Sequence, residues 1–345
     1  MAVRNATVPS LMDVMNRLDP NGSLSDIAEI LTQTHEALDD ISWGEGNLVT
    51  GDRFTVRTGK PTVGFRRINQ GTPRSKSTTA QVDEAAAMLV GKAQCDRDLA
   101  ILSGNIAKYR MDEGRSFIEA MGDQFMQTLS YGNAIFESAQ FTGLTPRFNS
   151  VGNTQVIDAG GTGTDNRSIW LIVWGDYVKG LYPKNTKGGL MHMDTTANKS
   201  MGPDGHPIGD EVLDEAGNPY LAYKDHWQWN CGLKIRDPRY IVRIANIDFS
   251  LLSKDRSSGA DLQDLMVQAL GRIQRIEGGN AAFYAPRDLH TMLDRQASSD
   301  TRAFSGYGLD GFGRGDFGRG AGRLAFRGVP IRREDVLNVD EARVV

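Results

Sequence analysis

Residues 52–95 read DRFTVRTGKPTVGFRRINQGTPRSKSTTAQVDEAAAMLVGKAQC. Apolar and polar side chains alternate over 54–58 and again over 63–67, a turn follows at 71–73, and 77–82 has the composition of a returning strand. The pattern predicts a β-hairpin with legs of about 15–20 residues, or roughly 50–60 Å at ~3.3 Å per residue. Strands of about 3–10 residues are typical, so this hairpin is expected to reach onto another molecule. Two ordinary hairpins in sequence are the alternative.

Charge is segregated along the chain. All charged residues between 53 and 76 are basic, and these seven are the candidates for contact with a second copy: Arg53, Arg57, Lys60, Arg66, Arg67, Arg74 and Lys76. Between 194 and 225 seven acids face only two lysines, and 302–333 is basic again. Opposite patches on two copies could steer association and set its register. Solvated loop faces are the alternative interpretation.

The rest of the N-terminal half favours helices. Residues 23–40 have a capping serine and helical spacing of apolar residues. Local propensity favours a helix over 84–90, which conflicts with a long hairpin leg. The best helix is 111–131, where one stripe is apolar: Phe117, Ile118, Met121, Phe125 and Leu129.

After residue 150 strands and helices mix. Residues 169–174 (IWLIVW) predict a strand buried on both faces, and 221–235 has the clearest period-two pattern. The remaining expected elements are strands at 240–247 and 281–285, helices at 261–273 and 286–296, a segment rich in glycine at 306–322, and an edge strand at 328–333. Pro330 is the reason for expecting an edge, because proline cannot donate to a central ladder.

Length and composition limit the classes of protein that this chain can belong to. The chain has 345 residues, 39% hydrophobic and 24% charged, which is enough for about two folded domains. It contains no apolar run long enough for a membrane span and no apolar signal-peptide run at its start. Cys95 and Cys231 lie far apart and predict buried thiols in a reducing compartment. The net charge of -4 argues against a protein that binds nucleic acid over its whole surface.

No constellation of residues predicts catalysis, a cofactor or a metal. Residues 313–318 match GxGxxG, but neither the preceding strand nor the following helix of a dinucleotide site is expected there. The five histidines show no ligand spacing. The acid pairs Asp83-Glu84 and Asp214-Glu215 are adjacent in sequence, so their side chains diverge.

Phrases spread along the whole chain carry a family likeness. They are Gly46-Asn47-Leu48, Thr55-Val56-Arg57-Thr58-Gly59, Ser75-Lys76-Ser77-Thr78-Thr79, Tyr131-Gly132-Asn133, Gly143-Leu144-Thr145-Pro146-Arg147, Ala159-Gly160-Gly161-Thr162-Gly163, Ser168-Ile169-Trp170-Leu171, Tyr240-Ile241-Val242-Arg243-Ile244-Ala245-Asn246-Ile247 and Phe326-Arg327-Gly328-Val329-Pro330-Ile331-Arg332-Arg333. In this order they resemble the major capsid protein of tailed bacteriophages, which has the Hong Kong 97 fold.

The resemblance implies an α+β fold in five parts. These are an N-terminal arm (1–45), an extended loop with flanking strands (46–95), a peripheral domain with a long spine helix (96–150), a mainly axial domain (151–325), and a C-terminal strand and tail (326–345). It also implies that the extended loop lies over a neighbouring subunit and that 84–95 is a strand, against its helical propensity.

The implied function is structural. Copies would form hexamers and pentamers that close into an icosahedral head around double-stranded DNA, which they would touch only weakly and without sequence preference. A scaffolding protein, a portal and a decoration or cement protein are the further expected partners, with no membrane, and the chain is expected in the virion after synthesis in the host cytoplasm. Some family members crosslink through a lysine of the extended loop, but nothing near Lys60 or Lys76 identifies a partner, so crosslinks are not predicted. The alternative is an oligomeric α+β protein of another kind that binds nucleic acid through the basic hairpin.

Overall fold

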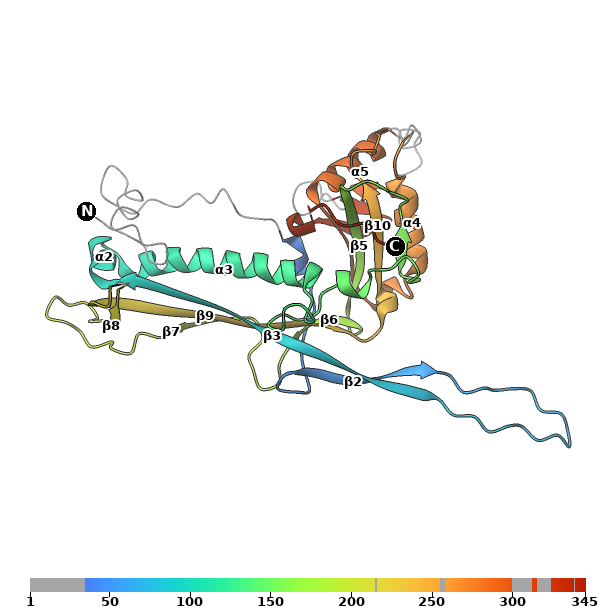
Figure 1. The fold of residues 1–345 in the computed structure, drawn as a ribbon, viewed down its shortest axis with the longest axis horizontal. Coiled ribbons are helices and arrows are strands. Elements are labelled where there is room, and N and C mark those ends of the chain that lie inside the picture. The colour runs from blue at the N-terminus through green and yellow to red at the C-terminus, as the bar shows by residue number, and fades with distance from the viewer. Residues whose placement is uncertain (1–34, 215, 255–257, 300–311, 315–323, 338) are drawn as a thin grey trace. The chain divides into compact units, whose positions relative to one another are not determined.

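The computed structural model describes residues 35–345 except 215, 255–257, 300–311, 315–323 and 338 (Figure 1). The expected helix at 23–40 lies outside the described residues except for its end, where Glu36–Asp39 forms a 3-10 helix. Of the segment 306–322, only β12 (Phe312–Arg314) is described. The described helices include none that is long and apolar enough to cross a membrane.

The chain forms two compact units that are discontinuous in sequence. The described part of unit 1 comprises 88–125 and 189–230, and unit 2 comprises Thr34–Ala87, Met126–Gly188 and Cys231–Val345. Three long elements contribute residues to both units: β3 (Thr78–Asp96), α3 (Ile106–Tyr131) and β9 (Pro219–Ile235). Three of the boundaries between the units therefore fall inside β3, α3 and β9.

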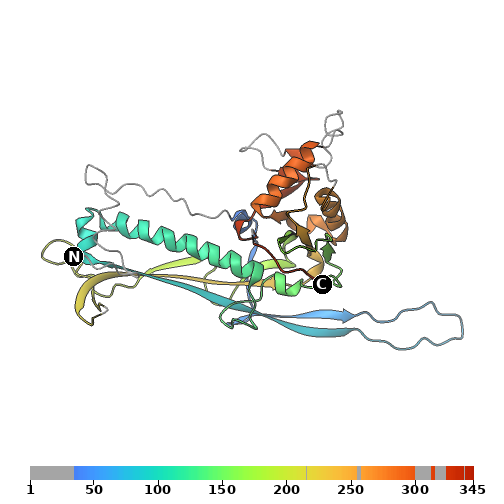
Figure 2. The same ribbon diagram turned by 45° about the horizontal axis from the view of Figure 1, so that its top comes forward.

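Residues 51–96 form a single hairpin. β2 (Gly51–Gly59) pairs antiparallel with β3, from Gly51 opposite Ala85 to Gly59 opposite Thr78, and Figure 2 shows both strands continuing into an open loop. The alternative of two hairpins is therefore wrong, and so is the second stretch of strand at 63–67. Pro61 and Pro73 lack the N–H that a ladder needs, and residues 60–77 stay unpaired.

Residues 84–95 form a strand, as the resemblance implied and against the helical propensity of 84–90. The sheet that contains it has the order β1-β6-β9-β3-β2, with β7 and β8 also pairing with β9. Its other strands are β1 (Trp43–Glu45), β6 (Val178–Tyr182), β7 (Leu190–Asp194) and β8 (Asp210–Leu213). Neighbouring strands on this ladder satisfy the backbone groups of 84–95, which outweighs the weak preference of its alanines for helix.

In unit 1 a helix packs closely on the sheet. Asp96 caps α2 (Arg97–Leu102), and α3 then starts at Ile106, five residues before the predicted start. A Cβ on Gly114 would lie 2.5 Å from the ring of Trp227, so glycine is what permits the approach of α3 to β9. Of the predicted apolar stripe, Met121 and Phe125 are buried but Ile118 is exposed.

In unit 2 a second sheet forms the core, with the order β12-β13-β14-β11-β5-β10-β4. Its remaining strands are β4 (Val156–Asp158), β5 (Asn166–Gly175), β10 (Ile241–Asp248), β11 (Gly279–Ala285), β13 (Leu324–Phe326) and β14 (Val329–Arg333). α4 (Leu262–Arg272) contacts β10 and β4, and α5 (Arg287–Ser299) contacts β14. Short 3-10 helices lie at Thr145–Arg147, Pro238–Tyr240, Ile276–Gly278 and Asp335–Leu337. As predicted, 169–174 is buried along its whole length.

The predicted edge strand at 328–333 is wrong. β14 lies between β13 and β11. Pro330 is tolerated because the ladder with β11 begins one residue later, with Ile331 opposite Phe283. Arg327 and Gly328 both have positive φ angles, 49° and 81°, which suit the tight turn that leads from β13 into β14.

Both cysteines are buried free thiols, as predicted. Burial raises the pKa of Cys95 and of Cys231 to about 12. Thiols with so high a pKa stay protonated and unreactive at neutral pH.

Candidate inter-subunit surface

The hairpin is anchored to unit 2 by two ion pairs at its base. Asp52 on β2 pairs with Lys234 on β9, and both side chains are buried. The Lys234 ammonium also lies 5.7 Å from the ring centre of Phe54. Removing either charge would leave the other buried without a partner, which is strongly destabilising.

The second anchor is a bidentate pair on the opposite leg. Arg147 donates to both carboxylate oxygens of Glu84, at 2.7 and 2.6 Å, and Glu84 is buried. The same guanidinium donates to the backbone oxygens of Thr142 and Gly143. Both legs of the hairpin are therefore held to the core of unit 2 near their roots.

Arg53 does not belong with the other contact candidates. Its guanidinium donates to both oxygens of Asp83, at 2.6 and 2.7 Å, across the β2–β3 ladder. This hydrogen-bonded pair raises the pKa of Arg53 and lowers the pKa of Asp83. Adjacent Asp83 and Glu84 point to opposite faces, as expected of a strand.

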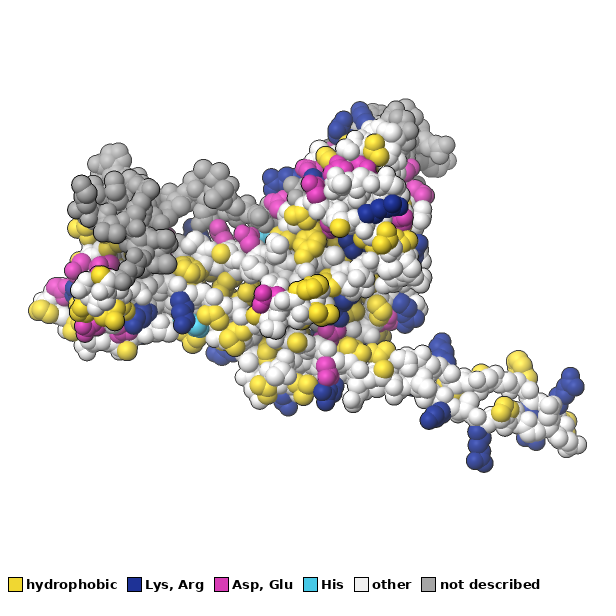
Figure 3. All heavy atoms as spheres, in the orientation of Figure 1, with side chains coloured by type: hydrophobic (Ala, Val, Ile, Leu, Met, Phe, Trp, Pro, Cys, Tyr) yellow, Lys and Arg dark blue, Asp and Glu magenta, His cyan; other side chains and the backbone are white. Residues whose placement is uncertain are grey.

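Beyond the anchors, every residue from 60 to 81 is exposed. Three large apolar side chains in this loop have nearly complete exposure: Val63 (88%), Phe65 (109%) and Ile68 (92%). Figure 3 shows basic side chains projecting along the same loop. Within the described part of the chain, no acid pairs with the other six candidates: Arg57, Lys60, Arg66, Arg67, Arg74 and Lys76.

The loop has some internal order. Ser75 donates to the backbone oxygen of Thr62 at 2.7 Å, which ties its two legs together. At the tip, Arg66 Nε donates to the backbone oxygen of Gln70 at 2.9 Å, and Asn69 adopts a left-handed conformation with φ 66°. The tip is thus a defined turn that displays Phe65 and Ile68 to solvent.

The acidic stretch 194–225 is arranged differently. Arg110 donates to both oxygens of Asp225, at 3.0 and 2.7 Å, and lies 2.9 Å from Asp194. Burial alone would raise the pKa of Asp194, but hydrogen bonds from Arg110, Thr196 and Lys199 hold it well below its usual range. His192 completes the cluster, 2.8 Å from Asp225 and stacked on Trp227.

Most other acids of this stretch also bind within unit 1. Asp204 pairs with Arg97, Asp210 accepts from the backbone N–H groups of Ala197 and Asn198 and pairs with Lys224, and Asp214 caps a turn. Glu211 is exposed, and Glu215 lies outside the described residues. Four cations therefore pair with acids of this stretch, namely Arg97, Arg110, Lys199 and Lys224, and most of its carboxylates are engaged within unit 1.

No chemical site emerges from the part of the chain that the structure describes. Within it, no group of three or more His, Cys, Asp or Glu side chains could hold a metal ion. Most of the GxGxxG match at 313–318 lies outside the described residues.

Sequence reasoning missed the partners that fix the hairpin and the acidic cluster. Lys234, Arg147 and Arg110 are distant in sequence from the acids they bind. In the alternating run 221–235, Lys234 falls on the polar face of the strand together with Lys224 and His226. The sequence therefore gave no signal that Lys234 is buried or that Asp52 is its partner.

An α+β subunit with a firmly anchored base and a long, exposed basic and apolar loop is a building block for assembly. A family model described as "Major capsid protein GP7" matches residues 19–345. The chain belongs to this family of major capsid proteins. No curated protein sequence matches it.

Solved structures agree with this family. The chain is similar to one in a structure of bacteriophage Epsilon15, with 29% sequence identity over 100% of both chains and a TM-score of 0.74. A chain of the bacteriophage JBD30 capsid is 9% identical over 89% of this chain and 92% of that one, with a TM-score of 0.48, too distant to bear on function. The fold is therefore the Hong Kong 97-like α+β fold, and copies of this chain form an icosahedral phage capsid. The family match disfavours the alternative of a non-capsid nucleic-acid-binding protein.

Proposed function

We propose that the subunits assemble as hexamers and pentamers into a head that encloses double-stranded DNA, and that each copy docks its loop of residues 60–81 on a neighbouring copy. The observation that carries the docking proposal is the complete exposure of this loop, including Phe65 and Ile68, above a base held by buried ion pairs. Burying a large apolar side chain contributes roughly 1.5–3 kcal/mol. An isolated subunit does not gain this free energy for Phe65 or Ile68, because both are exposed.

The anchored base favours docking on entropic grounds. The pairs Asp52–Lys234 and Glu84–Arg147 fix the direction in which the loop leaves unit 2. A preorganised loop loses less conformational freedom on binding than a free tail would. The five cations of the loop, none paired with an acid of the described chain, add long-range attraction to an acidic surface of the neighbour.

The remaining roles follow the same proposal. Residues 1–45 act as the arm, the part that contains α3 acts as the peripheral domain, and the second sheet forms the core of the axial domain. A scaffolding protein, a portal and a decoration or cement protein are the expected partners. Contact with packaged DNA is weak and non-specific, which suits a chain of net charge -4. The subunit is made in the host cytoplasm and acts without catalytic activity or a cofactor.

Charge reversal of the loop tests the docking role. Arg66→Glu with Arg67→Glu should abolish shells in a co-expression assay while leaving a folded, soluble subunit, because both side chains are exposed and carry no internal ion pair. Negative-stain microscopy counts the shells, and circular dichroism checks the fold. The matched control is Lys184→Glu with Lys187→Glu, which makes the same change in charge at exposed positions outside the loop.

Normal shells from the loop variant would contradict the contact role of Arg66 and Arg67 without affecting the assignment to the capsid family. If the control also lost its shells, net charge and not the loop would be responsible.

A further inference from the structure

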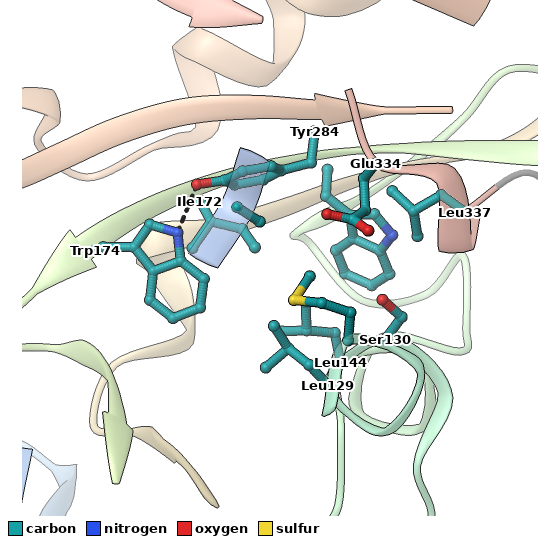
Figure 4. A pocket seen from close by; sticks show the side chains of 11 residues that line it. Leu129, Ser130, Leu144, Ile172, Trp174, Tyr284, Glu334 and Leu337 are labelled. Carbon is teal, nitrogen blue, oxygen red and sulfur yellow. Dashed lines mark hydrogen bonds between the residues drawn. The ribbon is translucent and has the colours of Figure 1, made fainter. Parts of the chain in front are cut away.

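A small cavity lies in unit 2 where segments distant in sequence meet. Its lining comes from the 3-10 helix at Glu36–Asp39, the last turns of α3, the second sheet and the 3-10 helix at Asp335–Leu337, with Leu144 and Glu334 beside them, through eleven residues: Ala37, Met126, Leu129, Ser130, Leu144, Trp170, Ile172, Trp174, Tyr284, Glu334 and Leu337. Its volume is about 20 Å³, measured as the space open to the centre of a water molecule. Figure 4 shows the side chains of Ser130 and Glu334 directed toward this space.

Two polar atoms on this wall have no hydrogen-bond partner among the described residues. Glu334 is 1% exposed; its Oε1 lies 2.5 Å from His35 Nδ1, but its Oε2 is unpaired. Trp170 is also 1% exposed, and its Nε1–H donor is unpaired. Two residues that each carry one unpaired polar atom therefore line one cavity, which is otherwise mostly apolar.

The neighbouring indole shows that this pattern is particular to Trp170. Trp174 lines the same cavity, but its Nε1 donates directly to the Tyr284 hydroxyl at 2.7 Å, as the dashed line in Figure 4 marks. Tyr284 in turn donates to Asp40. Direct pairing thus satisfies one indole of the cavity and leaves the other without a protein partner.

We propose that this cavity is a binding site for a single internal water molecule. The water accepts a hydrogen bond from Trp170 Nε1, donates one to Glu334 Oε2, and forms a third with the Ser130 hydroxyl. One water has two donors and can accept two bonds, so all three contacts are compatible at once.

The size and polarity of the site both favour this ligand. A cavity needs roughly 10–15 Å³ of space for its centre to hold one water, and internal waters typically make about three hydrogen bonds. About 20 Å³ admits one such molecule and excludes an organic ligand. A buried carboxyl group and an indole N–H without partners are also costly beside an apolar space.

The water would join parts of the chain that are distant in sequence. Trp170 lies on β5, Ser130 on the last turn of α3, and Glu334 immediately after β14, where it also holds His35 at the start of the described chain. The bound water would therefore link the end of α3 to the second sheet.

The first test is direct observation in the full-length protein. A density map of assembled particles at about 2 Å resolution should show a peak in the cavity at hydrogen-bond distance, about 2.7–3.2 Å, from Trp170 Nε1, Glu334 Oε2 and Ser130 Oγ. A cavity without density in a map that resolves other internal waters would overturn the proposal. So would a direct hydrogen bond between Trp170 and Glu334.

The second test separates the water from ordinary packing. Trp170→Phe and Ser130→Ala should each lower the Tm of the unassembled subunit, and the double variant should lose less than the sum, because both changes act on one water. The matched control is a second cycle that combines Trp174→Phe with Ser130→Ala. Trp174 also lines the cavity, but its indole has its own hydrogen-bond partner. Additive losses in the Trp170 cycle, or equal coupling in the Trp174 cycle, would contradict a shared water.

Discussion

The basic stretch 53–76 and the acidic stretch 194–225 look like mirror images in the sequence, yet the fold treats them in opposite ways. Six of the seven cations are exposed and have no acid partner among the described residues, five of them on the loop 60–81 and Arg57 on β2. Most acids of the other stretch bind arginines, lysines or backbone N–H groups of their own unit. The first stretch is left open to another molecule, as the docking proposal requires, whereas most of the second takes part in contacts within its own unit.

This difference teaches that a run of like charge is not in itself a charged surface. Long-range attraction requires net charge that solvent can reach, and Arg110 and Lys199 together offset the charges of Asp194 and Asp225. Under the docking proposal, these two acids are therefore not expected to form the acidic surface that receives the loop. Each prediction below perturbs one side of the comparison.

The largest effect on folding is expected from Arg110→Ala. Asp225 is buried, and loss of its guanidinium partner would leave a buried charge unpaired, at a cost of about 3 kcal/mol. Urea denaturation of the unassembled subunit measures this loss. Arg57→Ala is the control, because an exposed cation on β2 without an acid partner should change the free energy of unfolding by less than about 0.5 kcal/mol.

The same cluster should make the subunit sensitive to acid. The folded-state pKa of Asp194 is depressed, so its contribution to stability is present above its unfolded pKa of about 3.9 and is lost as the pH falls through the lower folded value. The Tm of the wild type should therefore fall below about pH 4, and that of Arg110→Ala should fall less steeply. Equal slopes would show that Arg110 does not set this pKa.

An intermediate effect, on assembly alone, is expected from Phe65→Ser. A fully exposed aromatic contributes nothing to the isolated subunit, but a buried aromatic anchor is typically worth about 2 kcal/mol or more at an interface. Assembly should require at least about tenfold more subunit, as measured by light scattering, with Tm unchanged. Phe65→Leu retains an apolar side chain and should assemble much more readily; if both variants behaved like the wild type, Phe65 would not be an anchor.

The smallest effect is expected from Glu211→Lys. Glu211 is an exposed acid of the 194–225 stretch, and its reversal should leave both Tm and shell yield close to those of the wild type. A loss of shells comparable to that of the loop variants would mean that this stretch does dock on another copy, which would reverse the comparison.

Local pattern was a good guide where one periodicity dominated. The apolar run 169–174 became the fully buried middle of β5, and 221–235 became most of β9. Local pattern was a poor guide where pairing with distant strands decided the structure. The alanines of 84–90 favour helix, but ladder pairing makes them strand, and Pro330 indicated an edge although β14 has neighbours on both sides.

The candidate surface was predictable only in part. The sequence identified the seven basic residues but did not separate Arg53, which pairs with Asp83 across a ladder, from the six that remain free. Register decides that pairing, because Arg53 faces Asp83 only when Gly51 lies opposite Ala85. Composition alone cannot specify register.

By itself, the sequence determined that a long basic hairpin, a spine helix and buried strands follow one another in the order of a phage capsid protein, since periodicity, turn residues and the order of phrases are local properties. Only the tertiary structure decided which charges are free. Lys234, Arg147 and Arg110 pair with acids that lie between 63 and 182 residues away in the sequence. Charge neutralisation depends on distances of a few ångströms in space, and folding alone brings such distant residues together.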